Sequence, residues 1–161
     1  MNDETNLQAL RASRLAADLD EDECRVLSAL VSVRDLGDGD VLVHEGTADN
    51  HLYVIAHGAL GIVKNAQTDA RVTIATLGPG DLAGELGFID GAKRQSSLVA
   101  QGGARVVSLE REQLESLLAA HPVIVYHVMR AIIRTVHEIQ RRLSLQAVEL
   151  SNYVYKQHGR Y

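Results

Sequence analysis

The spacing of leucines near the start of the chain predicts two short helices. Over residues 7–19 the leucines recur at helical spacing, which places Leu7, Leu10, Leu15 and Leu19 along one face. A second helix is predicted over residues 21–30. Asp20 and Glu23 fit a capping box at its start, in which each side chain binds the other residue's backbone N–H. The chain therefore begins with helical structure.

After Ser32 the pattern changes to short runs rich in β-branched and aliphatic residues, separated by glycines. The runs are VSVRDL, VLVHEG, HLYVIAHG, ALGIVKN, RVTIATLG, SSLVAQ and ARVVSLE. Short strands at regular spacing with glycine turns are typical of an antiparallel sandwich or jelly roll. Nothing in this region has the pattern of a βαβ unit. We expect a mainly β domain flanked by helices.

From Arg111 the period becomes helical again, and a long final helix is predicted from Pro122, since proline suits a first helical turn. Its apolar positions alternate at spacings of four and three: Val125, Met129, Ile132, Val136, Ile139, Leu143, Gln146 (the one polar member), Leu150 and Tyr153. This seam of about four heptads is longer than one small barrel can cover, so it predicts a parallel homodimer. A second row, Ile124, Val128 and Ile133, is expected to pack on the β domain.

Composition and charge narrow the function classes. No apolar run is long enough to cross a membrane, the acidic N-terminus is no secretory signal, and Cys24 is the only cysteine, which fits a reducing cytoplasm. The whole chain has a net charge of −5, but its C-terminal part is basic: residues 121–161 carry six bases and two acids. These arginines are spread along an amphipathic helix without interleaved aromatics, which favours a solvated helix face over a phosphate-binding stripe.

The loop GELGFIDGAKRQSS, Gly84 to Ser97, contains several residue types that can bind a ligand: an acid, glycines, an arginine, an amide and serines. Glycines let backbone N–H groups approach an anion closely, and Arg94 can grip a phosphate with two parallel donors. A carboxylate would be repelled by that phosphate, so Glu85 suits a ribose hydroxyl instead. The loop indicates a nucleotide site. An ordinary turn with a surface Glu–Arg ion pair would have the same composition, and these residues alone leave both interpretations open.

The run GPGDLAGELGFIDGAKR resembles the cyclic-nucleotide-binding domain family, which includes catabolite-activator-type regulators and kinase regulatory subunits. The family cassette reads G-E-L, a few residues, then R followed by small residues. The resemblance implies a double-stranded β-helix, a jelly-roll-like β-roll, over residues 1–120 with its N-terminal helices. It implies a dimerisation and lid helix over residues 121–161. Glu85 would accept the ribose 2′-hydroxyl and Arg94 would pair with the cyclic phosphate. Backbone N–H groups near Gly84, Leu86 and Ser96 would complete the cradle.

The sequence departs from the family pattern at two places. Gln95 follows Arg94, where relatives carry a small residue, and its amide could bind phosphate or narrow the pocket. Where adenine-binding relatives place hydroxyl residues near the base, the long helix has Ile139 and Gln140, with Thr135 one turn earlier. We expect a cyclic nucleotide, with cAMP favoured over cGMP, and these three residues are the candidates for base contacts.

Other classes of function find little support in the sequence. The histidines form no close metal-ligand pair on a helix face, and no serine or cysteine has a nucleophile signature, so we predict no catalytic residue, metal or cofactor. The prediction is a stand-alone cytoplasmic sensor that signals through its final helix to a protein partner. The segment SNYVYKQHGRY is too short for a DNA-binding module, so no DNA binding is expected from this chain alone. The alternatives are a truncated transcription regulator and a degenerate β-roll that dimerises without ligand.

Overall fold

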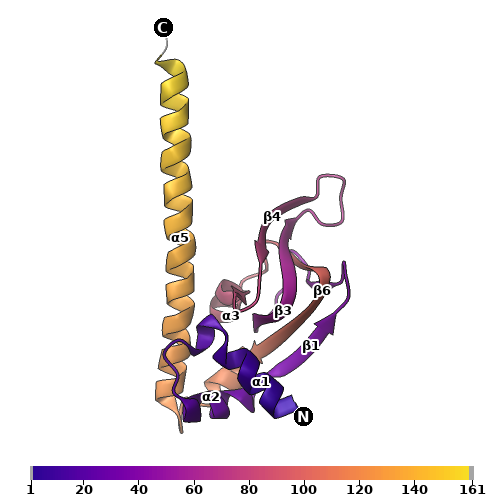
Figure 1. Ribbon diagram of the computed structural model, residues 1–161, viewed down its shortest axis with the longest axis vertical. Coiled ribbons are helices and arrows are strands. Elements are labelled where there is room, and N and C mark those ends of the chain that lie inside the picture. Colours follow the sequence, from indigo (N-terminus) through magenta and orange to yellow (C-terminus); the bar gives the residue numbers. More distant parts are fainter. Residues whose placement is uncertain (1, 160–161) are drawn as a thin grey trace.

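The computed structural model, which describes residues 2–159, has a β-roll with helices packed at one end and a single long helix that rises far above it (Figure 1). The helices are α1 (Asn2–Arg11), the 3-10 turn η1 (Arg14–Ala16), α2 (Glu21–Ser28), α3 (Glu85–Asp90), α4 (Arg111–Glu115) and α5 (Pro122–His158). The strands are β1 (Ser32–Leu36), β2 (Val41–Val43), β3 (His51–Lys64), β4 (Val72–Leu77), β5 (Leu82–Ala83) and β6 (Ser97–Glu110). The predicted β-roll with flanking helices and a long C-terminal helix is confirmed.

Two strands of 14 residues each, β3 and β6, form the centre of the antiparallel sheet. They pair from His51 with Glu110 to Val63 with Ser97; β1 and β2 add to β6, and β4 and β5 add to β3. The runs predicted from the sequence divide each of these strands at its glycines. That division was wrong, because the glycines form bulges: Gly58 has a φ of +78°, and a Cβ there would lie 2.1 Å from the carbonyl oxygen of Gly103.

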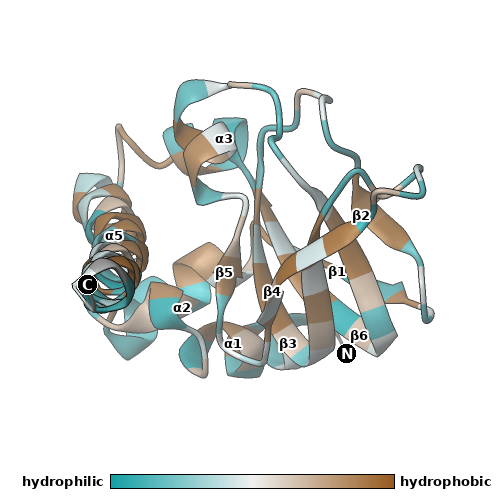
Figure 2. Cartoon of the chain, turned by 90° about the horizontal axis from the view of Figure 1, so that it is seen from above, coloured by the Kyte–Doolittle hydropathy of each residue, from teal (hydrophilic) through white to brown (hydrophobic). Residues whose placement is uncertain are grey.

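Buried side chains form two clusters. One fills the inside of the β-roll, with residues such as Ile55, Leu60 and Val106. The other lies between the helices and the adjoining end of the sheet, and every helix contributes to it, for example through Leu10 and Phe88. Figure 2 shows the helices beside the strands, seen from above. The second cluster joins α5 to the β-roll. The division at residue 120 therefore stays a prediction, since α5 begins at Pro122 but its first half belongs to a shared core.

The N-terminal helices differ in their bounds from those predicted. The capping box of Asp20 and Glu23 is present at the start of α2, as expected. The first helix ends at Arg11, whereas the leucine pattern had extended it to residue 19. Leu15 instead lies in η1, where it is buried in the same core as Leu10. A buried apolar residue in a short turn gives the same spacing as a continuous helix, which explains the error.

The first half of the long helix α5 packs against the body, and the second half extends beyond it (Figure 1). Ile124 and Val128 are buried against the body, as the predicted second row required, but Ile133 is 61% exposed. Ile132, assigned by the sequence to a dimer seam, is fully buried in the chain's own core. Both corrections have one reason: adjacent helical residues differ in direction by about 100°, and only the structure shows which of the two faces the body.

Ion pairs connect the first half of α5 to the N-terminal region of the chain. Arg134 binds Asp18 at 2.7 Å, Arg130 lies 3.8 Å from the same carboxylate, and Arg14 pairs with Glu138. Hydrogen bonding to Arg134 holds the pKa of Asp18 below its ordinary value. These pairs support the interpretation of the basic residues as a helix face rather than a phosphate-binding stripe. Within residues 2–159, no helix combines the length and apolar character needed to cross a membrane.

Candidate functional site

A cavity of about 260 Å³ opens between the loop that carries α3, the wall of the β-roll and the middle of α5. All six residues that the sequence assigned to ligand binding line it: Gly84, Glu85, Leu86, Arg94, Gln95 and Ser96. Aliphatic side chains form its apolar wall (Ile62, Leu77, Leu82, Leu98 and, from α5, Ile139). Among the described residues, no group of three or more His, Cys, Asp or Glu side chains is placed to hold a metal ion. The arrangement suits an organic ligand with one anionic group.

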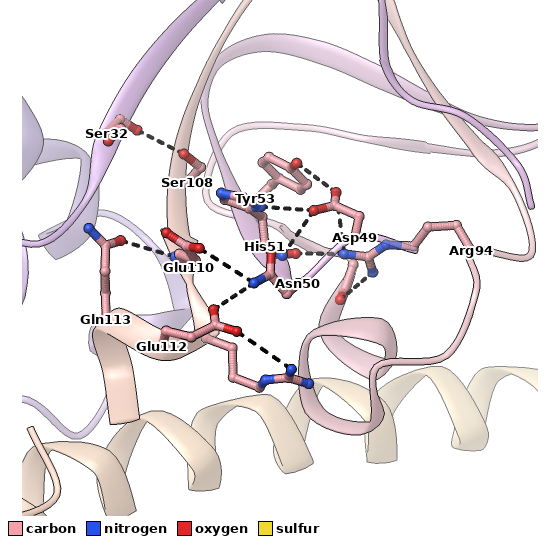
Figure 3. A network of polar contacts seen from close by, with 12 residues as sticks. Ser32, Asp49, Asn50, His51, Tyr53, Arg94, Ser108, Glu110, Glu112 and Gln113 are labelled. Atoms are coloured by element: carbon pink, nitrogen blue, oxygen red, sulfur yellow. Dashed lines mark hydrogen bonds and ion pairs between the residues drawn. The ribbon is translucent and has the colours of Figure 1, made fainter. Parts of the chain in front are cut away.

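Arg94 is the charged centre of this region, yet only 8% of it is exposed. Its Nη2 donates to the carbonyl oxygen of His51 at 2.6 Å, and its Nη1 donates to the carbonyl of Gly84. Its Nη2 also lies 3.6 Å from Oδ2 of Asp49 (Figure 3). The Nε of Arg94 is buried and has no partner among the described residues. A buried donor without a partner is costly, so this atom can gain a hydrogen bond from an anionic ligand.

Asp49 precedes β3 and is held by several donors. The hydroxyl of Tyr53 donates to its Oδ2 at 2.7 Å, while the backbone N–H of His51 donates to its Oδ1 at 3.1 Å (Figure 3). The ring Nδ1 of His51 also lies 2.8 Å from Oδ1. Burial alone would raise the pKa of Asp49, but these hydrogen bonds and the charge of Arg94 lower it overall. Asp49 therefore stays ionised behind the guanidinium.

Sequence reasoning missed Asp49. Its signal was indirect: a buried guanidinium requires a carboxylate or several carbonyl groups nearby, so the prediction of Arg94 as a site residue already implied such a partner. The chain has 21 acidic residues, and Asp49 lies 45 positions before Arg94. Nothing in the local spacing selects it from the others. The pairing of distant strands and loops brings it into place.

Two glycines of the loop make room for Arg94. A Cβ at Gly84 would lie 2.6 Å from Nη1 of Arg94, and a Cβ at Gly87 would lie 2.7 Å from the same atom. Gly84 also has a φ of +80°, which glycine adopts without strain. The sequence predicts that these glycines let backbone N–H groups approach an anion. The structure gives them a second role, since the guanidinium passes directly over them.

Glu85 lies at the first position of α3 and is partly buried. Burial raises its pKa, an effect opposed by its own backbone N–H and by the charge of Arg94. The buried Arg94 pairs with Asp49, so the alternative of an ordinary surface ion pair between Glu85 and Arg94 does not describe this loop. A carboxylate that lines a cavity and is costly to keep charged there is suited to accept hydrogen bonds from a ligand hydroxyl.

The three helix residues proposed for base contacts do not share one environment. Ile139 lines the cavity. Thr135 is buried, its hydroxyl donates to the carbonyl of Ala131 at 3.1 Å, and it does not line the cavity. Gln140 lies on another face of α5, beside a shallow groove that it shares with His137 and Arg141. Ile139 therefore lines the cavity, whereas Thr135 and Gln140 do not; the contacts of these three residues with a base stay predictions.

Comparison with known proteins agrees with this geometry. The family model described as cyclic nucleotide-binding domain matches residues 33–121. The cyclic AMP receptor protein of Thermus thermophilus is 27% identical over 111 residues, which are 69% of this chain and 51% of that protein. The cAMP-dependent protein kinase regulatory subunit of Blastocladiella emersonii is 25% identical over 107 residues, which are 66% of this chain and 27% of that protein.

Solved structures are similar over most of the chain. A cyclic nucleotide-binding domain from Methylobacillus flagellatus has a TM-score of 0.75 and 26% sequence identity, covering 87% of this chain and 79% of the other. This chain spans about half the length of the receptor from Thermus thermophilus and about a quarter of the kinase subunit.

Proposed function

Because this chain belongs to the cyclic nucleotide-binding domain family, whose model matches residues 33–121, we propose that it is a sensor that binds a cyclic nucleotide in the cavity beside Arg94. We take cAMP as the preferred ligand over cGMP, in keeping with the names of the relatives that this chain resembles. The sensor works in the cytoplasm and acts by binding, with no catalytic step of its own.

The observation that carries this proposal is the state of Arg94. Its guanidinium is buried beside a cavity and is held by Asp49 and two carbonyl groups, and its buried Nε has no partner among the described residues. A cyclic phosphate carries a single negative charge and has oxygens that can accept from Nε. Charge-assisted hydrogen bonds of this kind are short and strong. This unpartnered donor on a buried cation is the feature of the site that supports a phosphate-bearing ligand.

The other lining residues fit the remaining parts of a nucleotide. Glu85 accepts the ribose 2′-hydroxyl, and backbone N–H groups near Gly84, Leu86 and Ser96 bind phosphate oxygens. Gln95 lines the cavity and adds an amide donor. The aliphatic wall, with Ile139 from α5, lies against the base. These residues explain why the site suits a ligand with an anionic, a hydroxyl-bearing and an apolar part.

We propose that the signal leaves through α5. The helix supplies Ile139 to the cavity and then extends beyond the body with exposed apolar residues. A ligand that contacts the helix in only one position shifts the equilibrium between positions by its difference in affinity. The chain acts as a homodimer through this helix and presents the changed helix to a protein partner.

A second candidate function is the nucleotide-sensing part of a DNA-binding regulator. The chain covers about half of the receptor from Thermus thermophilus and about half of relatives named as transcriptional regulators of Mycobacterium tuberculosis. In that case the movement of α5 acts on a DNA-binding domain of the same, longer protein. The nucleotide site is the same in both candidates, so the first experiment addresses that site.

Isothermal titration of the protein with cAMP and with cGMP tests the proposal. We expect saturable binding, tighter for cAMP, and a loss of about 2–5 kcal/mol, or tens- to thousands-fold in affinity, for Arg94→Ala. Lys93→Ala is the matched control, since Lys93 also lines the cavity but is exposed, and it should change affinity less than about fivefold. Thermal unfolding confirms that each variant is folded.

Two results would contradict the proposal. Equal losses for Arg94→Ala and Lys93→Ala would mean that charge alone, without the buried geometry, attracts the nucleotide. The absence of heat for either nucleotide would favour a degenerate β-roll that dimerises without ligand.

A further inference from the structure

A second hollow of the molecule lies between α2 and the start of α5. Figure 1 shows α2 beside the first turns of α5, and Figure 2 shows the same two helices side by side from above. The groove between them has a volume of about 270 Å³ and shares no lining residue with the nucleotide cavity. Its walls include three carboxylates and two valines: Asp20, Asp22, Glu23, Val26 and Val123. We call it the acidic groove.

The acids that line the acidic groove differ from their neighbours in having no arginine partner. Residues 18–23 contain five acids, and the two that do not line the groove, Asp18 and Glu21, each have an arginine within 2.8 Å. None of the three groove acids forms an ion pair with a lysine or arginine among the described residues. Glu23 lies only 3.3 Å from the ring Nδ1 of His127. The groove therefore carries negative charge that the rest of the chain does not match.

Helix capping accounts for part of this acidic run but not for its charge. The carboxylate of Asp20 accepts from the backbone N–H of Glu23 at 2.8 Å, and the carboxylate of Glu23 accepts from the backbone N–H of Asp20 at 2.9 Å. These bonds cap α2 and bring no positive side chain to either acid. Asp22, the second residue of α2, is exposed, and its side chain makes no hydrogen bond or ion pair among the described residues. It is available to a cationic group from outside the chain.

The apolar part of the acidic groove is open to solvent. Val123 is 55% exposed, and Tyr126, three positions later on the same side of α5, is 61% exposed. Leu118, which shortly precedes the helix, is 54% exposed. Single exposed apolar residues are common, but several large ones beside uncompensated charge are typical of a surface that binds another protein.

The three carboxylates are not arranged as a metal site. Across residues 2–159, His, Cys, Asp and Glu side chains nowhere gather in threes so that they could hold a metal ion, and the acidic groove is included in that statement. Lysine and arginine side chains need no such convergence, because each can pair with a separate carboxylate. The exposed valine adds a second requirement, since it suits an aliphatic side chain next to the basic ones.

We infer that the acidic groove binds a short basic segment of a protein partner, in which lysines or arginines flank a leucine, isoleucine or valine. The inference rests on the proposed function for the existence of a partner and names the chemistry of that partner. The basic side chains pair with the three carboxylates, and the aliphatic side chain packs on Val26 and Val123. Complementary charge speeds the association of such a segment and disfavours acidic ones. One wall of the groove belongs to α5, so the partner contacts the helix that also supplies Ile139 to the nucleotide cavity.

Fluorescence anisotropy with a labelled peptide tests the inference. The probe is Gly-Lys-Arg-Leu-Leu-Arg-Lys-Gly, and two matched peptides carry serine in place of its leucines or glutamate in place of its basic residues. We expect saturable binding of the probe with a Kd on the order of 10–100 μM, weaker at high salt because ions screen the charges. The serine peptide should bind at least about tenfold more weakly, and the glutamate peptide should not bind.

Two pairs of variants locate the binding site. Asp22→Lys should weaken binding of the probe at least about tenfold. Asp3→Lys should change it less than about twofold, since Asp3 is also the exposed second residue of a helix but lies outside the acidic groove. Val123→Ser should weaken binding at least about threefold, whereas Val72→Ser should not, since Val72 is equally exposed at 55% on β4. Thermal unfolding confirms that each variant is folded.

Four outcomes would overturn the inference. The first is no saturable binding of the probe by wild type. The second is an equal loss for Asp22→Lys and Asp3→Lys, which would mean that net charge attracts the peptide. The third is equal binding of the serine peptide, which would leave the apolar residues without a role. The fourth is a wild-type dimer that Asp22→Lys converts to a monomer in sedimentation, because a second copy would then occupy the groove.

Titration of Asp22→Lys with cAMP separates this inference from the nucleotide site. The acidic groove and the cavity have no lining residue in common, so the variant should bind cAMP as wild type does. Binding of the probe by a protein that does not bind cAMP would refute the nucleotide site and support the acidic groove. Binding of cAMP without binding of the probe would refute the acidic groove and leave the nucleotide site in place.

Discussion

The Nη2 of Arg94 lies 3.6 Å from Oδ2 of Asp49, and the two side chains are 8% and 14% exposed. Arg94 comes from the loop after α3, and Asp49 comes from the turn before β3. Asp49 is held in turn by Tyr53 and His51, so the guanidinium rests on a carboxylate that is itself fixed. Three of the residues that fix the position of the arginine, Asp49, His51 and Tyr53, therefore lie outside the lining of the cavity.

Replacing Asp49 with asparagine should destabilise the protein at neutral pH by about 1–3 kcal/mol, because Arg94 loses its buried counter-charge. The pKa of Asp49 is lowered in the folded protein. Its stabilising effect is therefore present above the unfolded-state pKa and is lost as the pH falls through the folded value. The free energies of unfolding of wild type and Asp49→Asn, measured in urea, should therefore become more similar as the pH is lowered.

Tyr53→Phe is the matched control for this variant, since it removes one hydrogen bond to Asp49 and leaves the charge. It should cost about 0.5–1.5 kcal/mol. An unfolding midpoint for Asp49→Asn equal to that of wild type at neutral pH would show that the carboxylate does not support Arg94.

Gly87→Ala should displace the guanidinium of Arg94. The new Cβ would lie 2.7 Å from Nη1 and 2.9 Å from Cζ. Arg94 is buried and held by three partners, so it cannot move away freely. We expect a loss of about 1–3 kcal/mol in stability and a fall in cAMP affinity comparable to that of Arg94→Ala.

Leu86→Ala is a useful comparison, since Leu86 is 58% exposed and precedes Gly87 in the same short helix. It should change stability by less than about 0.5 kcal/mol. Normal cAMP binding by a folded Gly87→Ala variant would contradict the position assigned to Arg94.

Glu85→Gln should separate stability from ligand binding. Burial raises the pKa of Glu85, so the folded protein binds this proton more tightly than the unfolded chain does. Stability from this group is therefore fully present below the unfolded-state pKa of about 4.3 and is lost as the pH rises through the folded value. Glutamine carries no charge, so we expect Glu85→Gln to melt higher than wild type at pH 7, with a smaller difference near pH 4.

The same variant should bind cAMP more weakly by about 1.5–3 kcal/mol, because a neutral amide replaces a charged acceptor of the ribose hydroxyl. Calorimetry beside the melting curves measures both effects. A variant that is less stable than wild type at pH 7, or that binds cAMP as tightly, would refute the role given to this carboxylate.

Nucleotide binding should protect the middle of α5 from hydrogen exchange, through Ile139. This residue lines the cavity from the point where the helix leaves the body. We expect cAMP to protect residues 132–142 in addition to the loop at residues 84–97. Ile139→Ala should remove most of the helix protection while weakening binding less than Arg94→Ala. Gln140→Ala is the control and should retain the protection, since Gln140 lies on another face. Protection confined to residues 84–97 would show that binding is not transmitted to the helix.

Local patterns in the sequence predicted much of the fold and the loop of the site. The capping box at Asp20, the β-rich runs and the helix from Pro122 all depend on the order of neighbouring residues, and each appears where it was expected. The residues from Gly84 to Ser96 were also predicted together, because one short segment of the chain contains them all. Where the prediction failed locally, as at Gly58, glycine served a bulge instead of a turn, and both allow a positive φ.

Tertiary structure alone decided which distant groups meet. Asp49 lies behind Arg94 because the pairing of β3 with β6 and the loops at their ends bring two segments 45 residues apart into contact, and no local period encodes that distance. It also decided the direction of α5, where Ile132 faces the core and Ile133 faces outward. The apolar positions of α5 repeat with a helical period, so the sequence determined that the helix has an apolar stripe. The packing of the helix against the body decided which of its apolar side chains are buried, because burial depends on contacts with segments far away in the sequence.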